Sequence, residues 1–307
     1  MLIPCYNEEK TIEKVIRDFH KKVPNAVIYV YDNNSTDNTA TLAVEAGAVV
    51  RREYKQGKGN VIRRMFREID AKCYIMVDGD DTYPAKDAPA MVEAVLNRGI
   101  DMVIGDRLSS TYFIENKRLF HNIGNRIVRY SINRLFKSSI RDIMTGYRGL
   151  SYLFVKSFPV LSQRFELETE MTIHAIDKNM LIESVVVDYR DRSAGSVSKL
   201  NTVTDGIKVI KTIVSLFKNY RPMVFFTAIS TVLFLIGIVM FIPILITFFS
   251  TGLVPRFPTL FFCVFIWLVA IQLFFTGVTL DVIKEKNMHD FEMRLHEIEY
   301  RKKRQQL

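Results

Sequence analysis

The stretch Tyr74-Ile75-Met76-Val77-Asp78-Gly79-Asp80-Asp81 decides the fold of the first 200 residues. Four apolar residues without a helical spacing indicate a short buried strand, and the acidic turn comes at once after it. Two carboxylates one residue apart can both face a hard cation, which in turn neutralises the phosphates of a nucleotide. Acidic turns are also common without a ligand, so the stretch alone leaves both interpretations open.

Short apolar runs of the same kind recur before and after this stretch, and amphipathic helical patterns separate them. One such helix is marked by Ile12, Val15, Ile16 and Phe19. Alternation of strands and helices predicts an α/β domain with a largely parallel sheet, whose ligands bind at the carboxyl ends of the strands. The further expected strands are Val27–Tyr31, Ala48–Val50, Met102–Gly105 and Ile182–Tyr189.

Polar residues follow two more of these strands. The opening run ends in Pro4–Glu9, and the next ends in Asp32–Asp37. Ser35, Thr36 and Asn7 suit helix N-caps equally well. We expect both segments to lie beside Asp78–Asp81 at one edge of the sheet.

The segment from Met223 to Leu280 differs from the rest in carrying one charged residue, Arg256. The runs on either side of Arg256 both exceed the ~20 residues that a helix needs to cross ~30 Å of hydrocarbon. Two transmembrane helices joined by a turn at Ser250–Pro258 are therefore expected, with a buried helical hairpin of a soluble protein as the alternative.

Basic residues flank this hairpin on both sides, while the turn carries only Arg256. The positive-inside rule then places both ends of the chain in the cytoplasm. No secretory leader is recognised in Met1–Lys10. Ile207, Ile210 and Phe217, with lysines between them, predict a basic amphipathic helix at the membrane surface, and the stretch 123–137 is a second candidate.

The composition excludes several classes of protein. Three scattered cysteines give neither a disulfide framework nor metal-ligand spacing, and the five histidines show no metal spacing. A net charge of +9 suits nucleic acid or an acidic surface as partner. No nucleic-acid motif is present, and the basic residues gather beside the apolar spans.

The combination of motifs is more specific than any of its parts. The opening Pro4–Glu9, the turn Asp32–Asp37 and the acidic Asp78–Asp81 together resemble glycosyltransferases of family two with the GT-A fold. The downstream segments Gly105–Arg107, Asp142–Arg148 and Arg192–Lys199 are similar to one branch, the polyprenyl-phosphate glycosyltransferases. That branch includes dolichyl-phosphate mannose synthase and the GtrB-type enzymes, and its GtrB-type members share the hairpin after the catalytic domain.

The resemblance implies a role for each group of residues, and arginine suits a phosphate because its guanidinium is planar, always charged and bidentate. The nucleotide would contact Pro4, Tyr6, Glu8, Asp32 and Asp78. Asp78 and Asp80 would hold Mg²⁺ or Mn²⁺. The acceptor phosphate would contact Arg107, Arg118, Arg192, Ser198 and Lys199. Glu170 would serve the sugar pocket, and Asp142, Asp80 and Arg107 would form the catalytic set, with Asp142 either a base or a positioning group.

The implied reaction is inverting, metal-dependent transfer of a hexose from a nucleotide sugar to undecaprenyl or dolichyl phosphate on the cytoplasmic leaflet. UDP-glucose is the expected donor, with UDP-N-acetylglucosamine and GDP-mannose as alternatives. The acceptor is a phosphate monoester, largely ionised near neutral pH, so a strong general base is less necessary. The expected domains are 1–200 catalytic, 201–222 juxtamembrane, 223–280 hairpin and 281–307 basic tail; the oligomeric state is left open.

Two departures and three rival classes qualify this interpretation. The first strand is short, and Asn34 stands where the family commonly has glycine, which requires a backbone near the left-handed region. A processive polysaccharide synthase is rejected because its Q-x-x-R-W motif is absent and the only tryptophan is Trp267. A dinucleotide oxidoreductase is rejected because Gln56–Asn60 is neither G-x-G-x-x-G nor a P-loop. A non-catalytic membrane scaffold that binds nucleotide sugars stays as the alternative.

Overall fold

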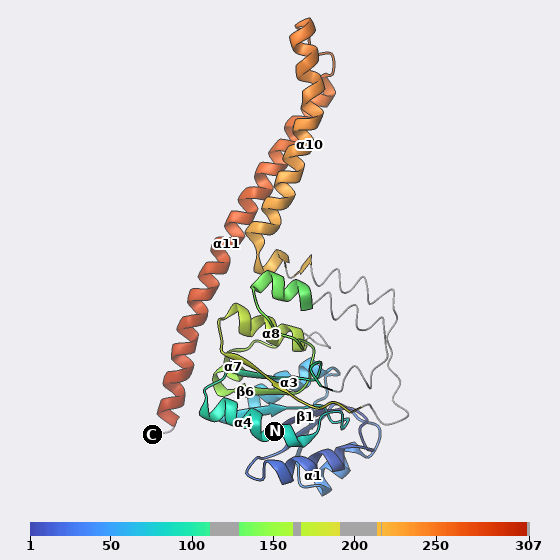
Figure 1. Ribbon diagram of the computed structural model, residues 1–307, viewed down its shortest axis with the longest axis vertical. Coiled ribbons are helices and arrows are strands. Elements are labelled where there is room, and N and C mark those ends of the chain that lie inside the picture. The colour runs from blue at the N-terminus through green and yellow to red at the C-terminus, as the bar shows by residue number, and fades with distance from the viewer. Residues whose placement is uncertain (111–128, 162–166, 191–213, 216, 306–307) are drawn as a thin grey trace. The chain divides into compact units, whose positions relative to one another are not determined.

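The computed structural model describes the chain except for residues 111–128, 162–166, 191–213, 216 and 306–307 (Figure 1). The chain forms two compact units. One unit contains Met1–Thr202 together with Met293–Leu307, and we call it the catalytic unit because the described residues that we expected to be catalytic lie in it; the other, the hairpin unit, contains Val203–Glu292.

A seven-stranded sheet forms the centre of the catalytic unit, in the order β3-β2-β1-β4-β6-β5-β7. The neighbours β1–β2, β2–β3, β1–β4 and β5–β7 pair in parallel. The prediction of an α/β domain with a largely parallel sheet is confirmed. The strands are β1 Leu2–Cys5, β2 Tyr29–Asp32, β3 Val49–Arg52, β4 Cys73–Met76, β5 Met102–Asp106, β6 Arg148–Ser151 and β7 Ile182–Val186.

Strand β6 is the one that the sequence interpretation missed. It lies between β4 and β5 and is antiparallel to both. Its four residues, Arg-Gly-Leu-Ser, contain no β-branched or aromatic side chain, so the local pattern does not indicate a strand. The pairing with two buried neighbours determines it instead.

Helices cover the sheet on two sides. Figure 1 shows α1 on one side of the sheet and α8 on the other. Helix α1 contacts α2 and α4, while α3 contacts α7. The helices are α1 Ile12–Lys22, α2 Thr39–Glu45, α3 Lys58–Glu68, α4 Ala88–Asn97, α7 Tyr152–Ser157 and α8 Leu167–Asp177, with a 3₁₀ turn η1 at Ala85–Asp87.

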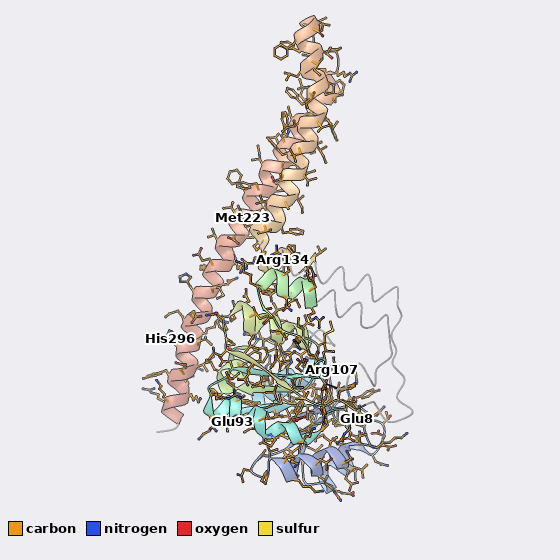
Figure 2. The ribbon with its side chains drawn as sticks, viewed as in Figure 1. Glu8, Glu93, Arg107, Arg134, Met223 and His296 are labelled. Atoms are coloured by element: carbon orange, nitrogen blue, oxygen red, sulfur yellow. The ribbon has the colours of Figure 1, made fainter. Side chains whose placement is uncertain are left out.

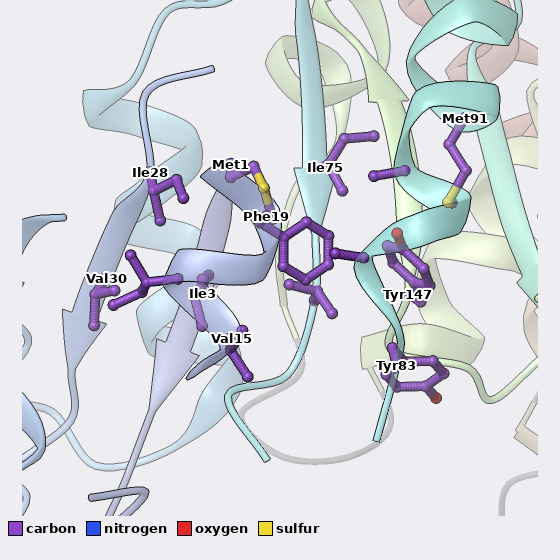
Figure 3. Close-up of a cluster of buried hydrophobic side chains, with 14 of the residues drawn as sticks. Met1, Ile3, Val15, Phe19, Ile28, Val30, Ile75, Tyr83, Met91 and Tyr147 are labelled. Atoms are coloured by element: carbon purple, nitrogen blue, oxygen red, sulfur yellow. The ribbon is translucent and has the colours of Figure 1, made fainter. Parts of the chain in front are cut away.

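The hydrophobic core joins α1 to the central strands. Ile12, Val15, Ile16 and Phe19 of α1 are buried, as their helical spacing predicts. Figure 3 shows Phe19 between Ile3, Ile75 and Tyr147, and its ring meets that of Tyr147 edge to face at 6.1 Å. The core therefore fixes α1 against the strands whose ends carry the polar residues.

The hairpin unit contains the long helix α10 Pro222–Thr251 and most of a second one, α11 Phe257–Gln305, whose residues from Met293 onward belong to the catalytic unit. Their most apolar windows have mean hydropathies of 2.9 and 2.3, and few residues of these windows are buried. By length and composition both can span a membrane. Helix α11 continues without a break through the residues that we expected to be a separate basic tail, and most of the expected amphipathic helix lies outside the described residues.

Close backbone approach holds the two long helices together. A Cβ on Gly237 would lie 2.3 Å from the indole Nε1 of Trp267, so only glycine fits against that ring. The indole N–H donates to the Phe234 carbonyl at 3.2 Å, and the Ser230 hydroxyl donates to the Ala270 carbonyl at 2.7 Å. Small residues and interhelical hydrogen bonds are the usual means by which apolar helices associate in lipid.

Candidate active site

The loops after β1 and β2 are hydrogen-bonded to each other at the edge of the sheet. The Asn7 amide oxygen accepts from the Thr36 N–H at 2.8 Å, and the Ser35 hydroxyl oxygen accepts from the Asn7 N–H at 2.9 Å. Ser35 and Asn7 therefore join the two loops rather than cap helices. Asn7 and Asn34 both have a positive φ, 57° and 64°, and Asn34 thus has the left-handed backbone that its place in the motif requires.

The predicted nucleotide residues lie on these two loops and on β1 and β2. Asp32 ends β2, is buried, and accepts from the Ser35 N–H at 3.2 Å. Pro4 lies inside β1, Glu8 precedes α1, and Tyr6 is 51% exposed. In Figure 2 Glu8 and Arg107 lie on the same side of the catalytic unit, whereas Glu93 of α4 lies on the opposite side. The sheet thus brings the expected donor residues to one edge.

Asp78 and Asp80 follow β4 at the same edge. One oxygen of Asp78 accepts from the Lys58 ammonium at 2.6 Å, and Asp80 accepts from the Thr82 hydroxyl at 2.6 Å. Within the part of the chain that the structure describes, no three acidic, histidine or cysteine side chains are arranged to hold a metal ion. Two carboxylates still fit Mg²⁺ or Mn²⁺ when phosphate oxygens supply further ligands, which is the usual arrangement for Mg²⁺.

Lys58 is a site residue that the sequence interpretation missed. It is the first residue of α3, and its ammonium lies 2.6 Å from Asp78 and 2.7 Å from Glu168. Burial acts to lower the pKa of Lys58, but the two carboxylates outweigh it and hold that pKa above its usual value. The signal was the glycine-flanked segment Gln56–Asn60, which we compared only with phosphate-binding loops.

Arg107 and Asp142 form a buried ion pair, with 2.9 Å between Nε and Oδ2. Arg107 follows β5, and it also donates to the Tyr83 hydroxyl at 3.2 Å. Burial raises the pKa of the Asp142 carboxyl, and Arg107 opposes that effect. The structure therefore brings together two of the three residues that we expected in the catalytic set, although they are 35 positions apart in the sequence.

The segment from Asp142 to Arg148 packs directly against Asp78. A Cβ on Gly146 would lie 2.4 Å from an Asp78 carboxylate oxygen, so this glycine permits the close approach. Arg148 is fully buried and donates to the carbonyls of Thr145 and Ile143 at 3.1 and 2.7 Å. Burial lowers the pKa of Arg148 to about 10. Arg148 thus holds the segment in place from inside the protein.

The glutamates at the start of α8 divide into two environments. Glu168 is buried and joins the charged cluster through Lys58. Glu170, our candidate for the sugar pocket, is half-buried and accepts from the Leu161 N–H at 3.3 Å. The other acceptor-side candidates, Arg118, Arg192, Ser198 and Lys199, lie outside the described residues.

A mostly parallel sheet with acidic residues after its strands, and an arginine–aspartate pair at the same edge, is the architecture of an α/β enzyme. Residues 1–156 match the domain of glycosyl transferase family 2. The chain belongs to this family and is a glycosyltransferase. This confirms the resemblance seen in the sequence at the level of the family.

Curated relatives agree with this assignment, and solved structures share the fold. The protein RfbJ of Shigella flexneri is 56% identical over 107 residues, which are 35% of this chain and 83% of RfbJ. The glycosyltransferase AglJ of Haloferax volcanii is 33% identical over 231 residues, 75% of each chain. Glucosyl-3-phosphoglycerate synthase of Mycobacterium tuberculosis, solved with UDP, has a TM-score of 0.56 at 21% identity over 70% of this chain and 78% of its own, and shares the fold.

Proposed function

We propose that this glycosyltransferase moves a hexose, with UDP-glucose the first candidate donor, onto a polyprenyl phosphate at the cytoplasmic leaflet. One observation carries the proposal: a family-two catalytic unit and two helices apolar enough to cross a membrane occur in the same chain. A polyprenyl phosphate has a lipid chain that lies in the membrane and a charged phosphate at its surface, so an enzyme attached to the membrane can reach it. The structure of the mycobacterial synthase with Mn²⁺ and UDP-glucose supports a divalent metal and a UDP-sugar donor.

The donor would bind along the edge that carries Asp32, Asp78 and Asp80. The Asp32 carboxylate suits the imide N–H of a uracil or guanine base. Asp78 and Asp80 would hold Mg²⁺ or Mn²⁺, which neutralises charge on the departing diphosphate when bound. Lys58 keeps the Asp78 side chain in one position, because it bonds Asp78 and Glu168 at once.

The transfer itself needs little proton chemistry. An acceptor phosphate oxygen forms a bond to the anomeric carbon, the bond from that carbon to the diphosphate breaks, and the electron pair leaves with the nucleoside diphosphate. In-line attack inverts the configuration. The acceptor's second pKa is ~6, so its oxygen is already ionised near neutral pH. Asp142 then acts as a positioning residue that orients Arg107, and Arg107 stabilises phosphate charge.

A panel of nucleotide sugars tests this proposal. The full chain in detergent is given undecaprenyl phosphate with UDP-glucose, UDP-N-acetylglucosamine or GDP-mannose, and the lipid product is measured by mass spectrometry. We expect one donor, UDP-glucose, to give most of the product. Donor binding without product from any sugar would instead support the non-catalytic scaffold.

A matched pair of variants tests the metal residues. Asp80→Asn removes one charge from the edge and is expected to lower the rate by about 100-fold or more. Asp81→Asn is the control, because Asp81 forms ion pairs with Lys14 and Arg190 and has a positive φ that asparagine also adopts. An unchanged rate for Asp80→Asn would contradict the metal assignment.

A further inference from the structure

A basic pocket of about 400 Å³ opens beside the Arg107–Asp142 pair. Its lining includes Arg129, Arg141, Ser109, Asn133 and Ser139. We propose that this pocket binds a phosphate monoester, and that its occupant is the phosphate of the lipid acceptor. The inference rests on the proposed function and deepens it, because it locates the acceptor's charged end on residues that the family motifs do not include.

The positive charges of the pocket have no counter-charge among the described residues. Arg129 donates to the Arg141 carbonyl at 3.3 Å, and Arg141 donates to the Ser109 hydroxyl at 3.0 Å; both acceptors are neutral. No carboxylate lines the pocket among the described residues, and neither arginine forms an ion pair with a described side chain. Two guanidiniums that face one cavity repel each other. A dianion between them attracts both, and these attractions outweigh the repulsion.

The walls of the pocket are held in position by hydrogen bonds. The Asn133 amide donates to the Ile140 carbonyl at 2.9 Å and accepts from the Ser138 hydroxyl at 2.7 Å. This fixes the turn that ends in Arg141. The Ser109 hydroxyl donates to Asp106, at the end of β5, at 2.6 Å. The donors are therefore positioned before a ligand arrives, which lowers the entropic cost of binding.

The position of the pocket relates it to the transfer reaction. Arg141 is the neighbour of Asp142, and Ser109 is two residues from Arg107, so each wall continues into one member of the buried pair. Arg107 is itself engaged with Asp142 and Tyr83. The guanidiniums of the pocket are thus positive charges near this pair that have no described carboxylate partner.

The surface beside the pocket favours a lipid over a soluble phosphate. The helical residues 129–136 bury Ile132 and Leu135, whereas Tyr130 is 69% exposed. Tyrosine has an apolar ring and a polar hydroxyl, and it is typical of surfaces that meet a membrane interface. The same phosphate chemistry occurs in free inorganic phosphate, so the test compares both sources.

Binding of a short lipid phosphate to the full chain in detergent tests the pocket without requiring turnover. The titrated ligands are farnesyl phosphate, farnesol and inorganic phosphate, measured by calorimetry. We expect the double variant Arg129→Gln/Arg141→Gln to bind farnesyl phosphate about 10-fold or more weakly than wild type, since two charge-assisted contacts are lost. Arg134→Gln is the matched control, because Arg134 lies on the same helix but does not line the pocket.

Three results would overturn the assignment. They are unchanged binding by the double variant, equal losses in Arg134→Gln, and farnesyl phosphate binding no tighter than inorganic phosphate.

The transfer assay separates this inference from the proposed function. In the double variant the KM for undecaprenyl phosphate is expected to rise about 10-fold while the KM for the nucleotide sugar stays unchanged. Transfer with a wild-type KM for the lipid would overturn the pocket and leave the function standing. The opposite result is also possible: wild type binds farnesyl phosphate more tightly than the double variant but transfers no sugar. That result would support the pocket and contradict the proposed function.

Discussion

Lys58 lies between Asp78 and the buried Glu168 with 15% of its own side chain exposed, whereas Arg129 and Arg141 line an open pocket without a described carboxylate. Removing one member of a buried ionic cluster leaves an uncompensated charge in a medium that solvates it poorly. An arginine at an open pocket keeps its water and needs no partner for the protein to fold. We therefore expect a change in the first cluster to lower both stability and activity, and a change in the two arginines to lower ligand binding with little effect on stability.

The largest effect is expected when the buried cluster is broken. Lys58→Met leaves Asp78 and Glu168 without their shared cation, and we expect a loss of about 3–5 kcal/mol in the free energy of unfolding. Urea denaturation of the full chain in detergent, followed by near-ultraviolet circular dichroism, measures this change. Lys14→Met is the control: Lys14 forms exposed ion pairs with Asp18 and Asp81, and its loss is expected to cost less than about 1 kcal/mol.

Equal losses for the two lysine variants would contradict the contrast between buried and open charges. Lys58→Arg keeps the charge but changes the shape of the donor. It is expected to recover part of the stability and less of the transfer rate, since the guanidinium does not reproduce both short contacts.

A second prediction concerns protonation of the buried side chain of His174. His174 lies on α8, the helix that carries Glu168, and packs edge to face against Phe154 and Phe158. Burial lowers the pKa of His174 from 6.5 to about 4. As the pH falls, His174 therefore binds a proton near pH 6.5 in the unfolded chain but only near pH 4 in the folded chain. Stability is full above pH 6.5 and falls by about 3 kcal/mol as the pH is lowered toward 4.

His174→Gln removes this titration. Unfolding measured at a series of pH values should show a flatter profile between pH 6.5 and 4 for the variant than for wild type. The same slope in both proteins would show that another group causes the pH dependence.

A third prediction concerns the position of Asp78. In Gly146→Ala the new methyl group would lie 2.4 Å from an Asp78 oxygen, so the carboxylate must move. We expect a cost of about 1–2 kcal/mol and a rise of about 10-fold in the KM for the nucleotide sugar. Gly149→Ala is the control, since its Cβ would meet only the apolar side chains of Val103, Ile75 and Val95 at 3.3–3.4 Å. A similar rise in the donor KM for both variants would mean that general overpacking is the cause.

The smallest effect on stability is expected for the two arginines of the open pocket. Arg129→Gln/Arg141→Gln removes two positive charges that have no described carboxylate partner, and the free energy of unfolding is expected to change by less than about 0.5 kcal/mol. The same urea titration measures it. A loss as large as that of Lys58→Met would show that these arginines serve the fold rather than a ligand.

Local patterns predicted the parts of the fold whose signal lies within a few residues. The apolar runs before Asp32 and Asp78 identified β2 and β4, and the spacing from Ile12 to Phe19 identified α1. Strand β6 escaped because its residues have no strand preference and its position depends on two partners elsewhere in the chain.

The residues of the candidate site likewise divide into those that local motifs predict and those that only the folded chain brings together. Asp78 and Asp80 could be predicted from the sequence because they follow an apolar run directly and occur together with the motifs Pro4–Glu9 and Asp32–Asp37. The pairs Lys58–Glu168 and Arg107–Asp142 join residues 110 and 35 positions apart. The motifs named Arg107 and Asp142 singly, but only the folded sheet determines which charge meets which, and Arg129 and Arg141 belong to no motif at all.

Helix α11 has a consequence for the boundary of the catalytic unit. Its residues from Met293 onward belong to the same compact unit as Met1–Thr202, and the Lys302 ammonium lies 5.7 Å from the centre of the Tyr152 ring. The residues that follow the apolar part of α11 are therefore part of the catalytic unit itself. A chain cut after Glu292 would lose a piece of that unit rather than a detached tail.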